Sequence, residues 1–366
     1  DAQESRGLGD VYKRQALYAS PDTTNSPGAV FNVSRVLIET SGRGSVGALA
    51  RMAGASISLS NSSIVTHGDL GYGLFASGRG ASVELQDSDV QTAGEQAHGL
   101  AISNNATTRF QGSTVVTNGS NAHGIVSFAT GAGVVNDVEV TSSHIQTEDG
   151  AGILVNGGGL TTRFTDSSLV GRSGGEQGTA LWITDRASGV LAGAVQLDAV
   201  RSNLFGDVLV DGGSLQLSLA DHSSLDGAIK GGSRDTQLSL DDSSVWTLRG
   251  DSQLTRLANN GVVEFADPGL AGAFKQLQVS GDLEGDGHYI MNTDLGLQQG
   301  DRLIVGGQVT GNNDILVRNS GSEPGAEGQS LTLVQSAGGP GSFSLANRGG
   351  VAVSYTHLTL PTIYSV

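Results

Sequence analysis

The stretch VELQDSDVQTAGEQAHGL, residues 83–100, contains both halves of a short repeat. One half is a polar pair, a variable residue and an aliphatic residue, here DSDV ending at Val90. The other half is a small or polar residue, a glycine and an aliphatic residue, here HGL ending at Leu100. Further copies of the first half end at Ile64, Val115, Ile145 and Leu169, and further copies of the second end at Leu74, Ile125 and Ile153, with a degenerate copy, TAL, at Leu181. The glycines at positions 73, 99, 124 and 152 are therefore 26, 25 and 28 residues apart.

This period predicts a stacked β-coil, in which each short unit buries its apolar face only against its neighbours. Apolar residues alternate with polar ones inside the repeats, which is the strand pattern. The 56 glycines of the 366 residues fit a chain that turns every few residues, and we expect them to supply positive-φ corners. No window of ten or more residues has a convincing helical period, so we expect almost no α-helix. No apolar stretch approaches the roughly 20 residues of a membrane helix.

The repeat also predicts which side chains form the core. Aliphatic residues at equivalent positions should stack from one coil to the next as two continuous internal columns. The first column would contain Ile64, Val90, Val115, Ile145 and Leu169, and the second Leu74, Leu100, Ile125, Ile153 and Leu181.

Charge and cysteine content narrow the function classes. The net charge is −16 and the pI about 4.7, and the chain has no basic stripe of the kind that neutralises nucleic-acid phosphates, so nucleic acid is not an expected partner. The chain has 0 Cys, which rules out disulfides and cysteine-based metal or nucleophilic sites and suits a secreted protein that stays unfolded during export. No signal peptide opens the chain, so we expect the start of the gene product to be missing.

Composition divides the chain into four parts. Residues 1–15 and 354–366 follow no repeat, and we interpret both as non-native or disordered ends. Residues 16–230 are predicted as β-helix coils, with a less regular beginning that carries one strand around residues 33–40. Residues 231–353 have a different spacing and longer apparent strands, and form the C-terminal part of the coil.

The last part resembles a known family. The run LVRNSGSEP from Leu316 to Pro324, followed by LTLVQS (331–336) and FSLANRGG (343–350), is similar to the C-terminal passenger region of pertactin-like autotransporters, a family of Bordetella-type adhesins. The pattern W-x-L-x-G-D-S from Trp246 to Ser252 is shared with autotransporter passengers more broadly.

The resemblance implies a right-handed, single-stranded parallel β-helix with an autochaperone-like C-terminal cap that nucleates folding outside the cell. It also implies export through the periplasm by the protein's own C-terminal outer-membrane β-barrel translocator, and display of a monomer on the bacterial surface. The barrel is absent from this sequence and the similarity stops at Val353, so we expect a truncated passenger. No cofactor or metal is implied, and the partner would be a host cell-surface or matrix receptor.

One tripeptide is a candidate binding site. Arg249-Gly250-Asp251 spells RGD, which many adhesive ligands present to integrins on an exposed turn. The same residues followed by Ser252 are also what a β-turn of the coil requires. Both interpretations stay open, and the turn interpretation is the simpler one.

Other motifs predict no chemistry. The GxGxxG match at residues 42–47 has no strand-to-helix crossover, and the GxSxG match at residues 171–175 has no helix behind its serine. His98 and His123 should lie one coil apart but without a third metal ligand, so we expect a surface pair. The acidic residues near position 240 could suggest a calcium-dependent polysaccharide lyase, but few basic residues accompany them, so we interpret them as solvated turn aspartates; they are Asp221, Asp226, Asp235, Asp241 and Asp242.

Three functions remain after these exclusions. The first is a surface-exposed adhesin or virulence-type passenger, which we favour and which is not an enzyme. The second is a polysaccharide-degrading β-helix enzyme. The third is an inert stalk that displays an N-terminal effector domain not present in this sequence.

Overall fold

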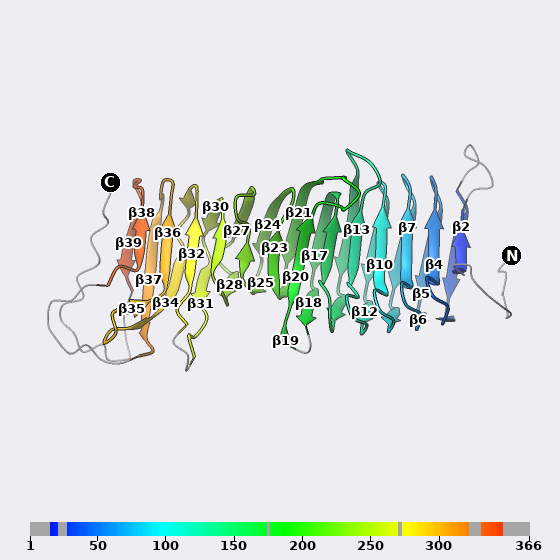
Figure 1. Cartoon of the computed structure of the whole chain (residues 1–366), viewed down its shortest axis with the longest axis horizontal. Coiled ribbons are helices and arrows are strands. Elements are labelled where there is room, and N and C mark those ends of the chain that lie inside the picture. The colour runs from blue at the N-terminus through cyan, green and yellow to red at the C-terminus, as the bar shows by residue number, and fades with distance from the viewer. Residues whose placement is uncertain (1–14, 21–27, 174–175, 270–272, 322–330, 347–366) are drawn as a thin grey trace. The chain divides into compact units, whose positions relative to one another are not determined.

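The computed structural model describes residues 15–20, 28–173, 176–269, 273–321 and 331–346. Within these ranges every regular element is a β-strand, and there is no helix and therefore no membrane-spanning helix. The chain divides into two compact units, residues 1–215 and residues 216–366. The described strands follow one another in groups of three, and each strand of a group joins a different sheet (Figure 1).

In the first unit the three sheets are parallel and run in chain order. Sheet A contains β1 (Gln15–Ala19), β4 (Val46–Arg51), β7 (Tyr72–Ser77), β10 (His98–Ser103), β13 (Ile125–Phe128), β16 (Ile153–Asn156), β20 (Thr179–Thr184) and β23 (Asp207–Val210). Sheet B contains β2 (Val30–Ser34), β5 (Ser56–Ser60), β8 (Ser82–Gln86), β11 (Thr107–Gln111), β14 (Val135–Thr141), β17 (Gly158–Thr165) and β21 (Ala192–Val200). Sheet C contains β3 (Leu37–Thr40), β6 (Ser63–Thr66), β9 (Asp89–Thr92), β12 (Thr114–Thr117), β15 (His144–Thr147), β18 (Ser168–Ser173) and β22 (Asn203–Phe205). The two-residue strand β19 (Glu176–Gln177) pairs antiparallel with β18.

The second unit repeats the plan after β24 (Ser214–Ala220). One parallel row is β26 (Ile229–Lys230), β29 (Ser252–Leu254), β32 (Gln276–Val279), β36 (Arg302–Val305) and β38 (Val334–Ser336). A second is β27 (Thr236–Leu240), β30 (Arg256–Asn259) and β33 (Leu283–Glu284). The third is β25 (Ser224–Asp226), β28 (Val245–Leu248), β31 (Val262–Phe265), β34 (His288–Asp294), β37 (Asn312–Asn319) and β39 (Ser342–Leu345), with β35 (Gln299–Gly300) antiparallel to β34. Each unit therefore has the parallel β-coil architecture that the repeat predicts, in agreement with the right-handed parallel β-helix that the resemblance implies.

The two predicted columns are confirmed in register and in burial. In sheet C, Ile64 pairs with Val90, which pairs with Val115, and the row continues through Ile145 to Leu169. In sheet A the second column runs through five paired residues, Leu74, Leu100, Ile125, Ile153 and Leu181. All ten side chains are 0–1% exposed. Burial of apolar surface at about 25 cal/mol per Å² along these columns provides the favourable energy of each coil.

Glycines with positive φ occur at corners as expected, for example Gly54, Gly80 and Gly112, but the repeated glycines of sheet A serve a different purpose. Gly73, Gly99 and Gly124 do not have positive φ. A Cβ at Gly99 would lie 2.3 Å from Val115 Cγ1 and 2.7 Å from the Gly124 carbonyl oxygen, and Gly73 and Gly124 have equivalent contacts. The glycines are required because the corner between sheets C and A brings two coils too close for any side chain.

Positive φ occurs at all three corners of the coil, and one regular set lies between sheets B and C, at the first residue of the polar pair. Asn61, Asp87, Ser142 and Asp166 all have φ between 47° and 51° there, and Gly112 has φ 59°. Polar residues with short side chains tolerate this left-handed conformation better than most. The first position of the repeat is therefore selected by backbone conformation.

The second position of the polar pair forms a buried serine ladder. From Ser88 onward each hydroxyl accepts the backbone N–H of the equivalent serine one coil earlier, and Ser62 accepts the Val36 N–H. Each hydroxyl also donates to the carbonyl oxygen two residues before it. For Ser113 these bonds are 3.1 Å from the Ser88 N and 2.9 Å to the Gln111 oxygen. The ladder contains Ser62, Ser88, Ser113, Ser143, Ser167 and Ser202, each 7% exposed or less.

Replacing Ser113 by alanine is expected to lower the free energy of unfolding of the first unit by about 1–3 kcal/mol, because the buried Ser88 N–H loses its acceptor. Thr114→Ala, at the half-buried neighbouring position, is the control and should change it by less than about 0.5 kcal/mol. Urea denaturation followed by circular dichroism measures both. Equal stability of the two variants would contradict a structural role for the ladder.

Two expectations about the beginning of the chain are affected by the structure. The single strand predicted around residues 33–40 is wrong, because Arg35 has φ 54° and divides the segment into β2 and β3, which belong to different sheets. The coils are regular from β2 onward. Residues 1–14 and 347–366, which include most of the first predicted end and all of the second, lie outside the described residues.

Candidate functional site

The RGD tripeptide forms the turn between β28 and β29 in the second unit. Arg249 and Asp251 are exposed, and Gly250 is half-buried. The Arg249 guanidinium forms a bidentate ion pair with Asp226, whose second oxygen accepts from Nη2 at 2.6 Å. This pair raises the pKa of Arg249 further above its ordinary value.

Asp251 is also bonded within the coil. Its Oδ1 accepts the backbone N–H of Gln276 at 2.8 Å, at the start of β32. The two charged groups of the tripeptide therefore connect three successive coils, through Asp226, the turn itself and Gln276. Both side chains are therefore bonded to neighbouring coils and remain exposed to solvent.

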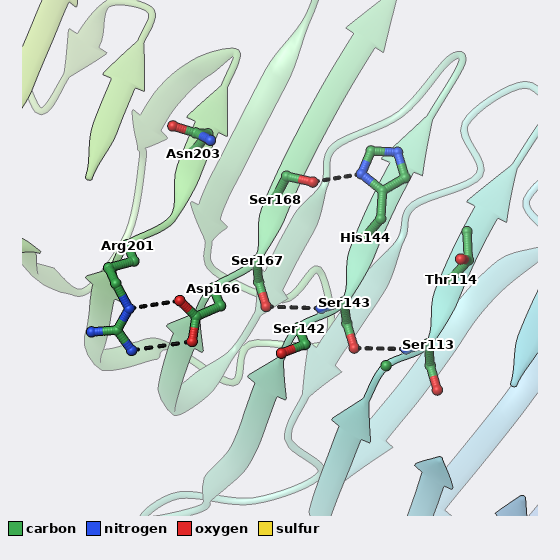
Figure 2. A pocket seen from close by; sticks show the side chains of 11 residues that line it. Ser113, Thr114, Ser142, Ser143, His144, Asp166, Ser167, Ser168, Arg201 and Asn203 are labelled. Atoms are coloured by element: carbon green, nitrogen blue, oxygen red, sulfur yellow. Dashed lines mark hydrogen bonds and ion pairs between the residues drawn. The ribbon is translucent and has the colours of Figure 1, made fainter. Parts of the chain in front are cut away.

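A polar groove lies on the first unit, at the corner between sheets B and C (Figure 2). Its volume is about 510 Å³, and its lining comes from the polar pair and the variable third position of four successive repeats. His144 Nδ1 lies 2.6 Å from Ser168 Oγ, and Asp166 accepts two bonds from Arg201 at 2.6 and 3.1 Å. Sequence reasoning missed this groove; the only signal was that the third position is always variable and often polar.

The groove offers hydroxyl groups, an imidazole and one closed ion pair. Its serine hydroxyls at positions 113, 143 and 167 belong to the buried ladder and are already bonded. His144 Nε2 also lies 3.2 Å from Gln146 Oε1, outside the groove. The arrangement has no free carboxylate pair beside the His144–Ser168 contact and indicates a hydrated surface.

His98 and His123 do lie one coil apart, but the expected surface pair is wrong. His123 is 9% exposed, and the two rings stack with centroids 5.1 Å apart. His98 Nδ1 accepts the His123 backbone N–H at 3.0 Å, and His123 Nδ1 accepts the Ala151 N–H at 2.8 Å. Tyr72 stacks on the other side of His98, with centroids 5.4 Å apart. The imidazoles continue the hydrogen-bond ladder from coil to coil.

Burial makes both imidazoles difficult to protonate. It lowers the pKa of His98 to about 3, with a further contribution from His123. Burial also lowers the pKa of His123 to about 4, although the Asp149 carboxylate opposes the shift. Because each Nδ1 is an acceptor, protonation at that atom would also break a hydrogen bond to the backbone.

The acidic residues near position 240 stabilise turns. Asp241 Oδ1 accepts from the Ser244 hydroxyl at 2.6 Å and from the Ser243 N–H at 3.1 Å. Among the described residues, no three His, Asp or Glu side chains are grouped so that they could hold a metal ion. The GxGxxG segment leads into strand β4, and the described part of the GxSxG segment ends β18.

A buried carboxylate in the second unit is equally satisfied. Asp301 is 0% exposed, and burial raises its pKa. Its oxygens accept the backbone N–H groups of Lys275 and Asn292, both at 2.7 Å, and the Asn292 side-chain amide at 3.0 Å. Because one buried carboxylate accepts three hydrogen bonds, Asp301 has a structural role. It connects the segment that precedes β32 with strand β34.

Comparison with known proteins shows that the chain is similar to parts of autotransporters. Residues 254–356 match the family model described as Pertactin. The chain is 32% identical over 216 residues to the autotransporter adhesin/invasin TibA of Escherichia coli O78:H11, covering 57% of this chain and 20% of TibA. It is 39% identical over 143 residues to the pertactin autotransporter of Bordetella parapertussis, covering 38% of this chain and 15% of that protein.

A third relative extends the similarity. The BrkA autotransporter of Bordetella pertussis is 28% identical over 201 residues, covering 52% of this chain and 18% of its own length. The chain thus spans a fifth or less of each of these relatives. The predicted resemblance to pertactin-like autotransporter passengers is confirmed.

Proposed function

We propose that the chain is part of an autotransporter passenger that acts as an adhesin and binds host or neighbouring cell surfaces. It is displayed on the extracellular side of a bacterial outer membrane, after export through the periplasm and with the help of a C-terminal outer-membrane translocator. Within it, residues 231–353 act as the autochaperone-like segment that nucleates folding of the coils in residues 16–230.

The observation that carries this proposal is the similarity to an autotransporter named as an adhesin/invasin, over 216 residues. That length exceeds the segment matched by the Pertactin model, so the similarity includes residues of the coil outside that segment. The fold supports the proposal because a solenoid presents long side faces to partners.

Attachment of beads coated with the purified chain to cultured epithelial cells tests the proposal. We expect several-fold more bound beads than with an unrelated acidic protein of similar size. Binding equal to that control would contradict adhesion and favour the inert stalk. Incubation of the same protein with neutral and acidic polysaccharides is the second arm, and release of reducing or unsaturated sugar ends would favour the enzyme.

For the RGD turn we propose a structural role, with receptor contact as the alternative. Asp251→Glu moves the carboxylate away from the Gln276 N–H, so we expect about 1 kcal/mol less stability in the second unit. Bead attachment per folded molecule should stay unchanged. Asp242→Glu, an exposed aspartate at another turn, is the matched control. Loss of attachment by folded Asp251→Glu protein alone would establish the tripeptide as a receptor site.

A further inference from the structure

The outward side of sheet C in the first unit carries two neighbouring rows of side chains. Strand alternation places Val115 inside the coil, so Thr114 and Val116 on either side of it point outward. The paired residues at the first of these positions form what we call the polar row, which contains Thr114, His144, Ser168 and Asn203. Those at the second position form the flanking row, which contains Val116, Gln146, Val170 and Phe205.

The polar row gives the groove a repeating character. All four of its residues line the groove, and Figure 2 shows them one after another from Thr114 to Asn203. The groove therefore runs along four successive coils, and its hydrogen-bonding side chains recur about every 4.8 Å. This spacing is close to the length of one pyranose unit in an extended polysaccharide chain.

The groove retains hydrogen-bonding capacity for a ligand. Within the described part of the chain, the hydroxyls of Thr114 and Ser142, which both line the groove, have no protein partner. The 2.6 Å contact between Ser168 Oγ and His144 Nδ1 occupies only part of a hydroxyl that can both donate and accept. Sugar hydroxyls can replace water at such groups and keep the number of hydrogen bonds unchanged.

The flanking row supplies apolar contacts beside the polar ones. Val116, Val170 and Phe205 are half-buried, and alternation within their strands directs the rest of their surface outward. A pyranose ring presents hydroxyls at its edge and C–H groups on its faces, and an aromatic ring such as that of Phe205 offers an apolar face to such groups. A polar row beside a largely apolar one therefore matches both parts of a sugar unit.

The charges around the groove favour a neutral saccharide. Among the described residues that line it, Arg201 is the one Lys or Arg, and it is bonded to Asp166 at 2.6 and 3.1 Å. The exposed Asp89 pairs with Thr114 and extends the polar row by one coil. The chain as a whole carries a net charge of −16. A sulfated or carboxylated chain would therefore meet repulsion of like charges.

The outward side of sheet B does not offer the same surface. Its paired outward residues include Glu84, Arg109 and Glu139. Arg109 forms ion pairs with Glu84 at 3.7 Å and with Glu139 at 2.9 Å. The uncharged hydrogen-bonding row is therefore a property of sheet C and not of the repeat.

We propose that the groove binds a neutral oligosaccharide chain that lies along the coils, with about one sugar unit on each of the four coils. The polar row bonds to the sugar hydroxyls, and the flanking row packs against the ring faces. This inference rests on the proposed function, because it names the class of cell-surface ligand that the adhesin binds. It involves binding alone and no bond cleavage.

Isothermal titration calorimetry of the purified chain tests the ligand class. The probes are three neutral hexasaccharides, cellohexaose, chitohexaose and the hexasaccharide of N-acetyllactosamine, with a heparin hexasaccharide as the acidic comparison. We expect at least one neutral probe to bind, with an affinity that rises with chain length and levels off at about four units. Absence of binding by all three neutral probes, or tighter binding of the heparin hexasaccharide, would overturn the proposal.

Two variants test the place of binding with the best neutral probe. Thr114→Ala and Phe205→Ala should each raise the dissociation constant about three- to tenfold, through loss of one hydrogen bond and of one aromatic face. The matched controls are Thr161→Ala, at an outward position of sheet B, and Phe75→Ala, at an outward position of sheet A; neither should change the affinity. Circular dichroism in urea establishes that each variant is folded. Equal affinities of all four variants would place the saccharide elsewhere and overturn the proposal.

Bead attachment separates this inference from the proposed function. Beads coated with the folded Thr114→Ala, Phe205→Ala double variant should bind several-fold fewer epithelial cells than wild-type beads. Undiminished attachment of the double variant would overturn the groove as the cell contact, while adhesion itself would stand. Saccharide binding by a wild-type chain that does not attach to cells would leave the groove in place and contradict the proposed adhesion.

Discussion

Replacement of Val115 by aspartate is expected to abolish cooperative folding of the first unit. Val115 is 1% exposed and pairs with Val90 on one side and Ile145 on the other, inside a column with no polar partner for a carboxylate. The variant loses about 1.5–3 kcal/mol of valine burial. Desolvation of an unpaired charge adds several kcal/mol more. Together these terms are comparable to the whole stability of a typical domain, about 5–15 kcal/mol.

Val116→Asp is the matched control, because the next residue of the same strand points outward and is only half-buried. It should lower the free energy of unfolding by less than about 1 kcal/mol. Thermal unfolding followed by circular dichroism compares the two variants with the wild-type chain. Similar melting temperatures for the two variants would contradict the inward column and with it the coil.

The inner columns were predictable because they depend on local alternation and on one repeat length. Val90 and Val115 are both recognisable as strand residues flanked by polar neighbours, and their 25-residue separation places them in adjacent coils. The reason for the glycines was not predictable in the same way. Gly99 is excluded from carrying a side chain by Val115 and Gly124, and neither contact follows from the local sequence.

The serine ladder and the alignment of outward-facing apolar residues along sheet A depend on register between coils. Ser88 looks like an ordinary turn residue until its hydroxyl is placed against the Ser62 N–H one coil earlier. Phe75 and Trp182 are more than 100 residues apart, and only the successive pairings of sheet A place them in one row. A search for like residues at equivalent repeat positions would have found both features, had it extended beyond the aliphatic ones.

The prediction that His98 and His123 form a surface pair was wrong, because it relied on the polar character of their side chains. An imidazole between two turns usually contacts water, and the sequence does not show that Tyr72 covers one face of His98. The RGD turn illustrates the opposite case. Its turn chemistry was predictable, whereas the bonds from Arg249 to Asp226 and from Gln276 to Asp251 required the structure.

The stacked imidazoles predict an acid-sensitive first unit. The pKa values of His98 and His123 in the folded chain, about 3 and about 4, lie below the unfolded value of about 6.5. The unfolded chain therefore binds more protons as the pH falls below about 6.5, so this contribution to stability is full above that pH and is lost towards pH 4. At about 1.4 kcal/mol per pKa unit, the two groups together should cost about 3–6 kcal/mol between pH 7 and pH 4.

The double variant His98→Asn, His123→Asn isolates the contribution of the two imidazoles to the pH dependence of stability. An asparagine oxygen can accept the same backbone N–H as Nδ1 but does not titrate in this range. Carboxylates contribute equally to both proteins, so the difference between their urea-unfolding free energies at pH 7 and pH 4 reports the imidazoles. We expect the wild-type chain to lose several kcal/mol more than the variant over this interval. Parallel pH profiles would mean that water reaches the rings and that the stack is not closed between coils.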